Sequence, residues 1–168
     1  MRFAFITPRY GADITRGPEH AARLFAEQLS LRHDVDVLTT CAADPHGARN
    51  AYAEGSDRVR GVLVRRFPVS GGHDPQALQH ISQRVFAGAH SRADELEWMK
   101  RSGPWSPALL EFLKRTNRNY DAFVFFSYRH ATTVHGLDVA PDRSILFPWL
   151  QLEPALRLQA SIDALKAA

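Results

Sequence analysis

The sequence predicts an α/β protein with a Rossmann-like, mainly parallel sheet and helices on both faces. Three observations predict this fold. An apolar run at residues 3–6 is followed by a polar segment and a helical pattern, which is the opening order of nucleotide-binding α/β folds. A second apolar run, at 35–40, lies at the spacing of a right-handed βαβ unit. A third, at 120–127, is apolar on both faces, as expected inside a parallel sheet.

The first strand ends at Thr7-Pro8, and a polar segment at 9–17 leads into a helix that begins at Pro18. Because this helix follows a glycine, its free N–H groups point back at the segment and suit a phosphate group. The segment lacks G-x-G-x-x-G spacing, so a βα unit without a ligand is the alternative. The apolar face of the helix is expected to consist of Ala21, Leu24, Phe25 and Leu29.

The part of the chain after the second strand is predicted to be a long loop, from Cys41 to Asp57, and then a β segment at 58–69. Gly61 divides this segment, which predicts a hairpin or a bent strand. Its two adjacent arginines, Arg65 and Arg66, are expected to form a solvated strand end.

A helical insertion is predicted around 74–118, and it is longer than a simple crossover needs. Asp74 suits an N-cap and Pro75 the first helical turn; further helical pieces follow at 91–101 and from Ser106-Pro107. After the strand at 120–127, a short buried strand is predicted within 142–149. The last helix is predicted to run from Ala155 to about Ala167.

Composition limits the class of function. The 168 residues fit one domain, and 21 Lys and Arg against 18 Asp and Glu give a net charge of +3. This mild excess does not predict nucleic-acid binding, although it permits an anionic ligand or a membrane surface. The single cysteine fits a reducing compartment, and no apolar run approaches the roughly 20 residues of a membrane helix. We expect a cytoplasmic protein that can contact a membrane peripherally.

The eight histidines are scattered and form no H-E-x-x-H or Cys/His cluster, so no metal site is predicted. Ligands of open α/β sheets bind outside the carboxyl ends of strands, and polar residues follow the predicted strands here. We expect them to converge on one edge of the sheet. The candidate binding residues are Gly17, Glu19, His20, Tyr128, Arg129, His130, Gln151 and Glu153, with Arg9 and Tyr10 beside them.

Several longer motifs occur in a recognisable order. The chain opens with MRFAFITPRYGADITRGPEHAARLFAEQL and continues with VDVLTTCA, GVLVRRFPV, EWMKRSGPWSPALLEFL, YDAFVFFSY and PDRSILFPW. Together these segments resemble the N-terminal domain of retaining, nucleotide-sugar-dependent glycosyltransferases of family four, which have the GT-B architecture. Within the first segment, G-P-E-H-A-A-R-L stands where that family tends to have a G-G-A-E-H-type motif. The resemblance covers nearly the whole chain.

The resemblance implies that residues 1–168 are a single acceptor-side domain, and that a C-terminal donor-binding domain, absent from this chain, completes the cleft. It implies transfer of a sugar from a nucleotide-sugar to an acceptor, which is a glycan, a lipid or a small molecule. The nucleotide-sugar is then a co-substrate held mainly by the missing domain, and no cofactor is implied. The isolated chain is expected to be inactive.

Two positions depart from the family pattern. Arg16-Gly17 replaces a glycine pair, so close backbone approach to a phosphate is partly lost. Gln151 stands at the histidine position of the subgroup pattern H-D-E-P, and glutamine can hydrogen-bond a sugar but cannot titrate. No catalytic residue is therefore assigned, and a non-catalytic GT-B-derived binding or regulatory module is the alternative. A dehydrogenase fragment is disfavoured because the G-x-G-x-x-G fingerprint is missing.

Overall fold

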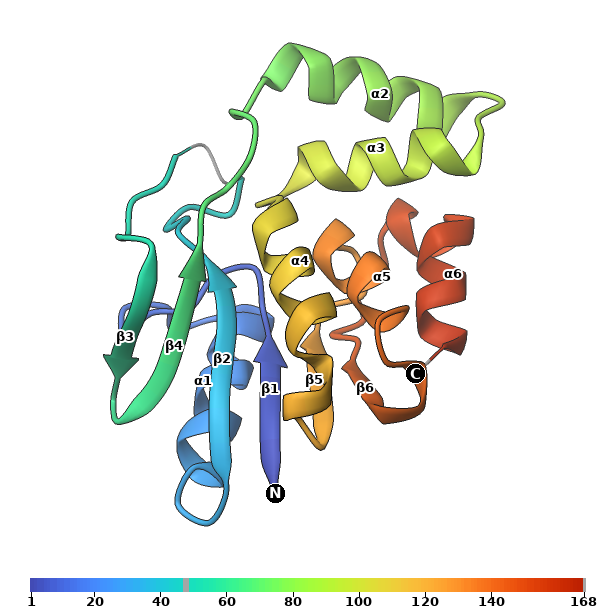
Figure 1. The fold of residues 1–168 in the computed structure, drawn as a ribbon. Helices are drawn as coiled ribbons and strands as arrows, with labels where there is room; N and C mark the ends of the chain where they lie inside the picture. Colours follow the sequence, from blue (N-terminus) through green and yellow to red (C-terminus); the bar gives the residue numbers. More distant parts are fainter. Residues whose placement is uncertain (47–48, 168) are drawn as a thin grey trace.

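The computed structural model describes residues 1–46 and 49–167 and confirms the predicted fold class (Figure 1). Six strands form one sheet in the order β3-β4-β2-β1-β5-β6. All neighbouring pairs are parallel except β3 and β4, which are antiparallel. The strands are β1 (Arg2–Ile6), β2 (Asp34–Thr40), β3 (Gly55–Val59), β4 (Val62–Phe67), β5 (Ala122–Phe126) and β6 (Ser144–Phe147).

Helices cover both faces of this sheet. One face carries α1, while α4, α5 and α6 cover the other, and α3 lies between α2 and the helices α5 and α6 (Figure 1). The predicted helical insertion is therefore present as α2, α3 and α4. The helices are α1 (Gly17–Leu29), α2 (Pro75–Ala87), α3 (Arg92–Ser102), α4 (Pro107–Thr116), α5 (Ala131–Leu137) and α6 (Gln159–Lys166), with short 3₁₀ helices at Asn117–Asn119, Pro141–Arg143 and Pro154–Arg157.

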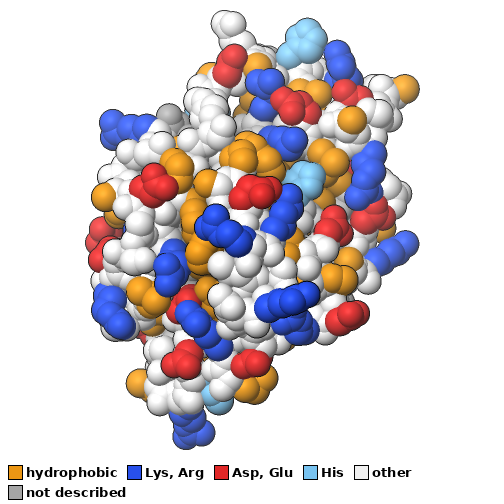
Figure 2. Space-filling model, in the orientation of Figure 1, with side chains coloured by type: hydrophobic (Ala, Val, Ile, Leu, Met, Phe, Trp, Pro, Cys, Tyr) orange, Lys and Arg blue, Asp and Glu red, His pale blue; other side chains and the backbone are white. Residues whose placement is uncertain are grey.

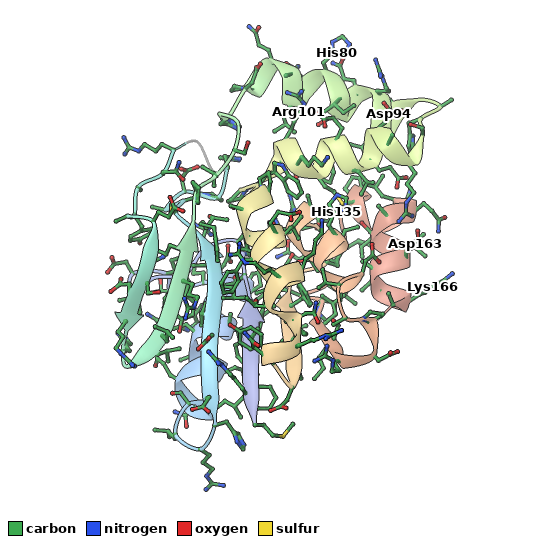
Figure 3. All side chains as sticks on the ribbon, viewed as in Figure 1. His80, Asp94, Arg101, His135, Asp163 and Lys166 are labelled. Atoms are coloured by element: carbon green, nitrogen blue, oxygen red, sulfur yellow. The ribbon has the colours of Figure 1, made fainter. Side chains whose placement is uncertain are left out.

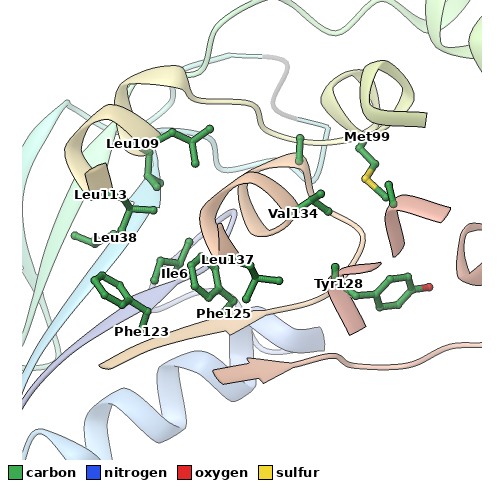
Figure 4. Close-up of a cluster of buried hydrophobic side chains, with 14 of the residues drawn as sticks. Ile6, Leu38, Met99, Leu109, Leu113, Phe123, Phe125, Tyr128, Val134 and Leu137 are labelled. Carbon is green, nitrogen blue, oxygen red and sulfur yellow. The ribbon is translucent and has the colours of Figure 1, made fainter. Parts of the chain in front are cut away.

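The two faces of the sheet have separate hydrophobic cores, and β5 contributes to both. Phe123 and Phe125 belong to the core under α4 and α5, where Figure 4 shows them beside Leu137. Val124 and Phe126 belong to the core under α1. The predicted burial of Phe123, Val124 and Phe125 is confirmed, and their strand lies between β1 and β6. Burial on both sides explains why this strand has no polar alternation.

The predicted hairpin is present as β3 and β4, joined by Arg60 and Gly61. Both residues have positive φ, at 49° and 87°, as a two-residue turn of type I′ requires. Glycine adopts this conformation without steric cost. The long loop predicted for 41–57 ends earlier than expected, because β3 already begins at Gly55.

The buried face of α1 differs from the prediction. Leu24 and Phe25 are exposed, whereas Ala22, Arg23 and Ala26 are buried. The two small alanines, four residues apart, let the helix approach the sheet closely. Phe25 instead extends toward the sheet edge, where its ring centroid lies 5.0 Å from that of Phe147.

The C-terminal part of the chain also departs from the prediction. β6 was expected to be buried, but it is the edge strand, and Ile145 and Phe147 are 51% and 41% exposed. The predicted last helix is broken at Leu158, which is extended between the 3₁₀ helix and α6. Helix α5 was not predicted, because β-branched residues such as Thr132 and Thr133 lower helix propensity.

Glu95 of α3 fastens the helical insertion to the C-terminal helix. Its side chain is buried, and its two carboxylate oxygens accept hydrogen bonds from the backbone N–H groups of Gln159 (3.0 Å) and Ala160 (2.7 Å). His90 Nε2 lies 3.1 Å from the same carboxylate. Since α6 has no side-chain N-cap of its own, Glu95 supplies the anionic cap that a helix N-terminus favours.

We expect Glu95→Ala to lower the free energy of unfolding by about 2–4 kcal/mol, because two buried N–H groups lose their charged partner. Chemical denaturation measures this loss. Glu97→Ala is the matched control: Glu97 pairs with Arg101 on the exposed side of α3 (2.7 Å), and such pairs contribute about 0.5 kcal/mol. Equal losses for the two variants would show that Glu95 does not anchor α6.

Candidate functional site

Loops at the carboxyl edge of the sheet contain residues with left-handed backbone. Gly17, at the start of α1, has φ 75°, Ser127 after β5 has φ 72°, and Trp149 after β6 has φ 51°. This conformation costs energy for residues other than glycine and is concentrated at functional sites. The same loops carry the polar residues that the sequence singled out.

Arg9 and Glu19 form the first part of the site. The guanidinium of Arg9 donates from Nε (3.0 Å) and from Nη2 (2.8 Å) to Oε1 of Glu19. Its Nη1 also donates to the carbonyl oxygen of Ala43, at 3.1 Å. The loop after β1, the first turn of α1 and the loop after β2 are thus joined by one arginine.

Tyr128, Arg129 and Glu153 form the second part. The Tyr128 hydroxyl donates to Oε1 of Glu153 (2.6 Å), and Arg129 Nη1 donates to Oε2 of the same carboxylate (2.8 Å). Burial, together with the hydrogen bond to Glu153, raises the pKa of Tyr128. The hydroxyl therefore keeps its proton at neutral pH and stays a donor.

His130 lies next to both parts. It precedes α5, and burial together with the positive charges of Arg129 and Arg9 lowers its pKa to about 3. The imidazole is therefore neutral near pH 7 and can accept one hydrogen bond and donate another. The ring packs against Gly103, where a Cβ atom would lie 3.0 Å from Nδ1, so a larger residue there would press on the imidazole.

Two predicted site residues are not joined to this network. His20 Nδ1 lies 3.2 Å from Nη2 of Arg23 on its own helix, and Gln151 is exposed. Within residues 1–46 and 49–167, no hydrogen bond or ion pair connects either residue to Glu19, Arg129 or Glu153. Pro18, in the first turn of α1, has no N–H to donate, and Arg16 makes no side-chain cap that would occupy the other N–H groups of that turn.

Arg66 was expected at a solvated strand end, and that expectation is wrong. The residue is 3% exposed, its Nη1 donates to the carbonyl oxygen of Tyr10 (2.7 Å), and its guanidinium lies 4.1 Å from the ring centroid of Tyr52. Burial lowers its pKa. Arg23 similarly donates to the carbonyl oxygen of Ala12. Two arginines therefore fix the loop after β1 through hydrogen bonds to its backbone carbonyl groups.

The burial of Arg66 had a signal in the sequence. Val62, Val64 and Arg66 alternate along β4, and all three are buried on the same face. A period of two assigns them to one side of a strand. By contrast, nothing local indicates that Glu19 and Glu153 would take arginine partners 10 and 24 residues away.

The arrangement favours binding over proton transfer. Arg9 and Arg129 are each paired with a carboxylate, and His130 is neutral at pH 7. Such a set of fixed donors and acceptors suits a ligand rich in hydroxyl groups. In the described part of the chain, no group of three or more His, Cys, Asp or Glu residues could hold a metal ion, and no helix there has the length and hydrophobicity to cross a membrane.

Comparisons with protein-family models and with curated protein sequences found no match for the chain.

We expect Arg66→Met to loosen the loop after β1. The substitution keeps most of the side-chain volume but leaves the Tyr10 carbonyl without its partner, which costs about 1–3 kcal/mol of unfolding free energy. Trypsin should then cut faster at Arg9 and Arg16. Arg58→Met is the control, because Arg58 is exposed and its guanidinium donates to the carbonyl oxygen of Gly61 in the hairpin turn. Unchanged cleavage in Arg66→Met would contradict the assigned role.

We expect the imidazole NMR signals of His130 not to titrate between pH 8 and 5, because its pKa is about 3. His90 is the internal comparison: hydrogen bonds to Gly88 and Glu95 raise its pKa above 6.5. The unfolded chain takes up a proton at His130 as the pH falls through 6.5, and the folded chain does not. This residue should therefore reduce stability as pH falls from about 6.5 toward 3, and a midpoint near 6.5 for His130 would exclude the buried, neutral state.

Proposed function

We propose that the chain is the acceptor-binding domain of a glycosyltransferase that transfers a sugar from a nucleotide-sugar to a glycan, a lipid or a small molecule. One observation carries this proposal: Tyr128 and Arg129 both donate hydrogen bonds to Glu153 at the carboxyl edge of a Rossmann-like sheet. This edge is where open α/β sheets bind their ligands. The resemblance of the sequence motifs to GT-B glycosyltransferases supports the same function.

The charge arrangement supports an acceptor-side role. A nucleotide-sugar carries a diphosphate, which needs free cationic groups or helix N–H groups. Arg9 and Arg129 are each paired with a carboxylate, and Pro18 in the first turn of α1 has no N–H to offer. An acceptor hydroxyl, in contrast, needs neutral donors and acceptors such as the His130 imidazole.

The surface beside Glu153 supports completion of the site by a second domain. Trp149, Leu150 and Leu152 are exposed, and Leu152 is fully so. Large apolar side chains gathered beside a polar site are typical of surfaces that another body covers. In the proposed enzyme this body is a C-terminal donor-binding domain, and the protein is cytoplasmic, with peripheral membrane contact where the acceptor is a lipid.

A non-catalytic binding or regulatory module is the second candidate, and one observation favours it. Gln151 occupies the position where the resembling subgroup has histidine, and His130 is neutral across the physiological range. General acid–base catalysis needs a group whose pKa lies near the working pH. The network could still recognise a sugar without transferring it.

We expect calorimetry to show no tight binding of nucleotide-sugars to the 168-residue chain. Transition-state stabilisation needs groups from both walls of a cleft, and this chain supplies one. Micromolar binding, about −8 kcal/mol, would instead place the donor site here. A longer chain that includes a downstream donor domain should transfer sugar. Arg129→Ala should abolish that transfer, whereas Arg118→Ala, at an exposed arginine of the 3₁₀ helix that precedes β5, should leave it unchanged.

The same binding and transfer measurements also test the alternative, a non-catalytic module. If the longer chain binds a sugar acceptor without transferring sugar to it, and Gln151→His restores transfer, then the domain is a degenerate enzyme. If neither chain binds sugars or nucleotide-sugars, both functions are excluded.

A further inference from the structure

A pocket lies away from the candidate site, between α4 and α5. Its volume is about 620 Å³, and it is lined by parts of α3, α4 and α5 and by the segments that follow α3, α4 and α5. Figure 3 shows His135 here, below α3 and beside α4. The polar and aromatic lining residues are Lys100, Trp105, Glu111, Lys114, His135 and Asp138.

His135 is the unexplained group in this pocket. Its Nε2 atom is buried and has no hydrogen-bond partner among the described residues. A buried polar atom without a partner costs free energy, and such atoms call for a ligand or an ordered water. The ring lies 5.5 Å from that of Trp105, and this contact fixes its position within the pocket.

Cationic groups surround His135. Burial is the main cause of its lowered pKa, and Lys100, Lys114 and Arg92 lower it further, while Asp138 raises it. Lys100 is held over Trp105, with Nζ 5.1 Å from the ring centroid. Lys100 and Lys114 are two of the three lysines in the whole chain, whose other basic residues are arginines. Figure 2 shows Lys and Arg side chains around a His between α4 and α5.

The other residues that line the pocket are acidic or apolar. Glu111 is paired with Lys114 at 2.9 Å, and Asp138 faces the same hollow, so carboxylate oxygens are available to accept hydrogen bonds from hydroxyl groups. Leu110, Val139 and the ring of Trp105 offer apolar surface for the C–H face of a ring. Pockets that combine apolar walls with a few converging polar groups are typical of small-molecule sites.

We propose that this pocket binds a small polyhydroxylated anion, such as a sugar phosphate, with its charged group on Lys100 and His135 Nε2 and its hydroxyl groups on Glu111 and Asp138. A neutral imidazole donates from Nε2 when that nitrogen carries the proton, and a bound anion stabilises the protonated ring as well. This site does not depend on the proposed transferase function, because it shares no residue with the network around Glu153.

The test uses the folded 168-residue chain, with glucose 6-phosphate as the probe and D-glucose and inorganic phosphate as single-feature controls. Calorimetry should show saturable binding of glucose 6-phosphate that is at least about tenfold tighter than that of either control, because charge and hydroxyl contacts add. In NMR spectra, the Trp105 indole and the His135 ring should shift together, and the pKa of His135 should rise on binding.

Lys100→Gln should weaken binding about tenfold or more, and Lys166→Gln is the matched control because Lys166 is an exposed lysine on α6 outside the pocket. His135→Phe tests the second contact. If this variant does not fold, a shift of the His135 NMR signals in the wild-type chain on adding glucose 6-phosphate tests the same contact. The proposal is overturned if glucose 6-phosphate does not bind, if inorganic phosphate binds equally well, or if binding leaves Trp105 and His135 unshifted.

Discussion

The pairing of β1 with two parallel neighbours is the constraint on which the rest of the structure depends. Phe3 is in register with Val35 of β2 on one side and with Ala122 of β5 on the other, although β5 comes more than 80 residues later than β2. The chain proceeds outward from β1 through β2 and β4, then returns to build β5 and β6. The loops that follow β1 and β5 leave the sheet on opposite faces, and the crevice between them collects the polar residues.

Within that crevice, the charged side chains form ion pairs: Arg9 with Glu19 and Arg129 with Glu153. Arg9 of the loop after β1 donates to Glu19 of α1 and to the carbonyl oxygen of Ala43 in the loop after β2. Glu153, after β6, accepts from Tyr128 and Arg129 of the loop after β5, so the four strand ends are joined in two pairs. Removing a charged group from water is costly unless a partner compensates it, and the paired arrangement meets that condition before any ligand arrives. It also leaves little charge to hold a diphosphate, which is why recognition of hydroxyl groups is the better fit.

The helical insertion links this crevice to the pocket between α4 and α5. Glu95 anchors α3 to α6, and the segment that follows α3 then places Gly103 against His130 and Trp105 against His135. One short connection therefore contacts a histidine of each site. Burial lowers the pKa of both rings, so both are neutral hydrogen-bonding groups near pH 7.

The sequence by itself determined the features that depend on neighbouring residues along the chain. Periodicity identified β1, β2 and β5, and glycine and proline marked the hairpin and the helix starts. The expectation that polar residues follow strands ending at one edge brought Tyr128 and Glu153 together. Only the tertiary structure decided which face α1 buries, that β6 is an edge strand and that Glu95 caps a distant helix. Those outcomes depend on which element packs against which, and a side chain's partner across 24 or 65 residues leaves no periodic signal in the sequence.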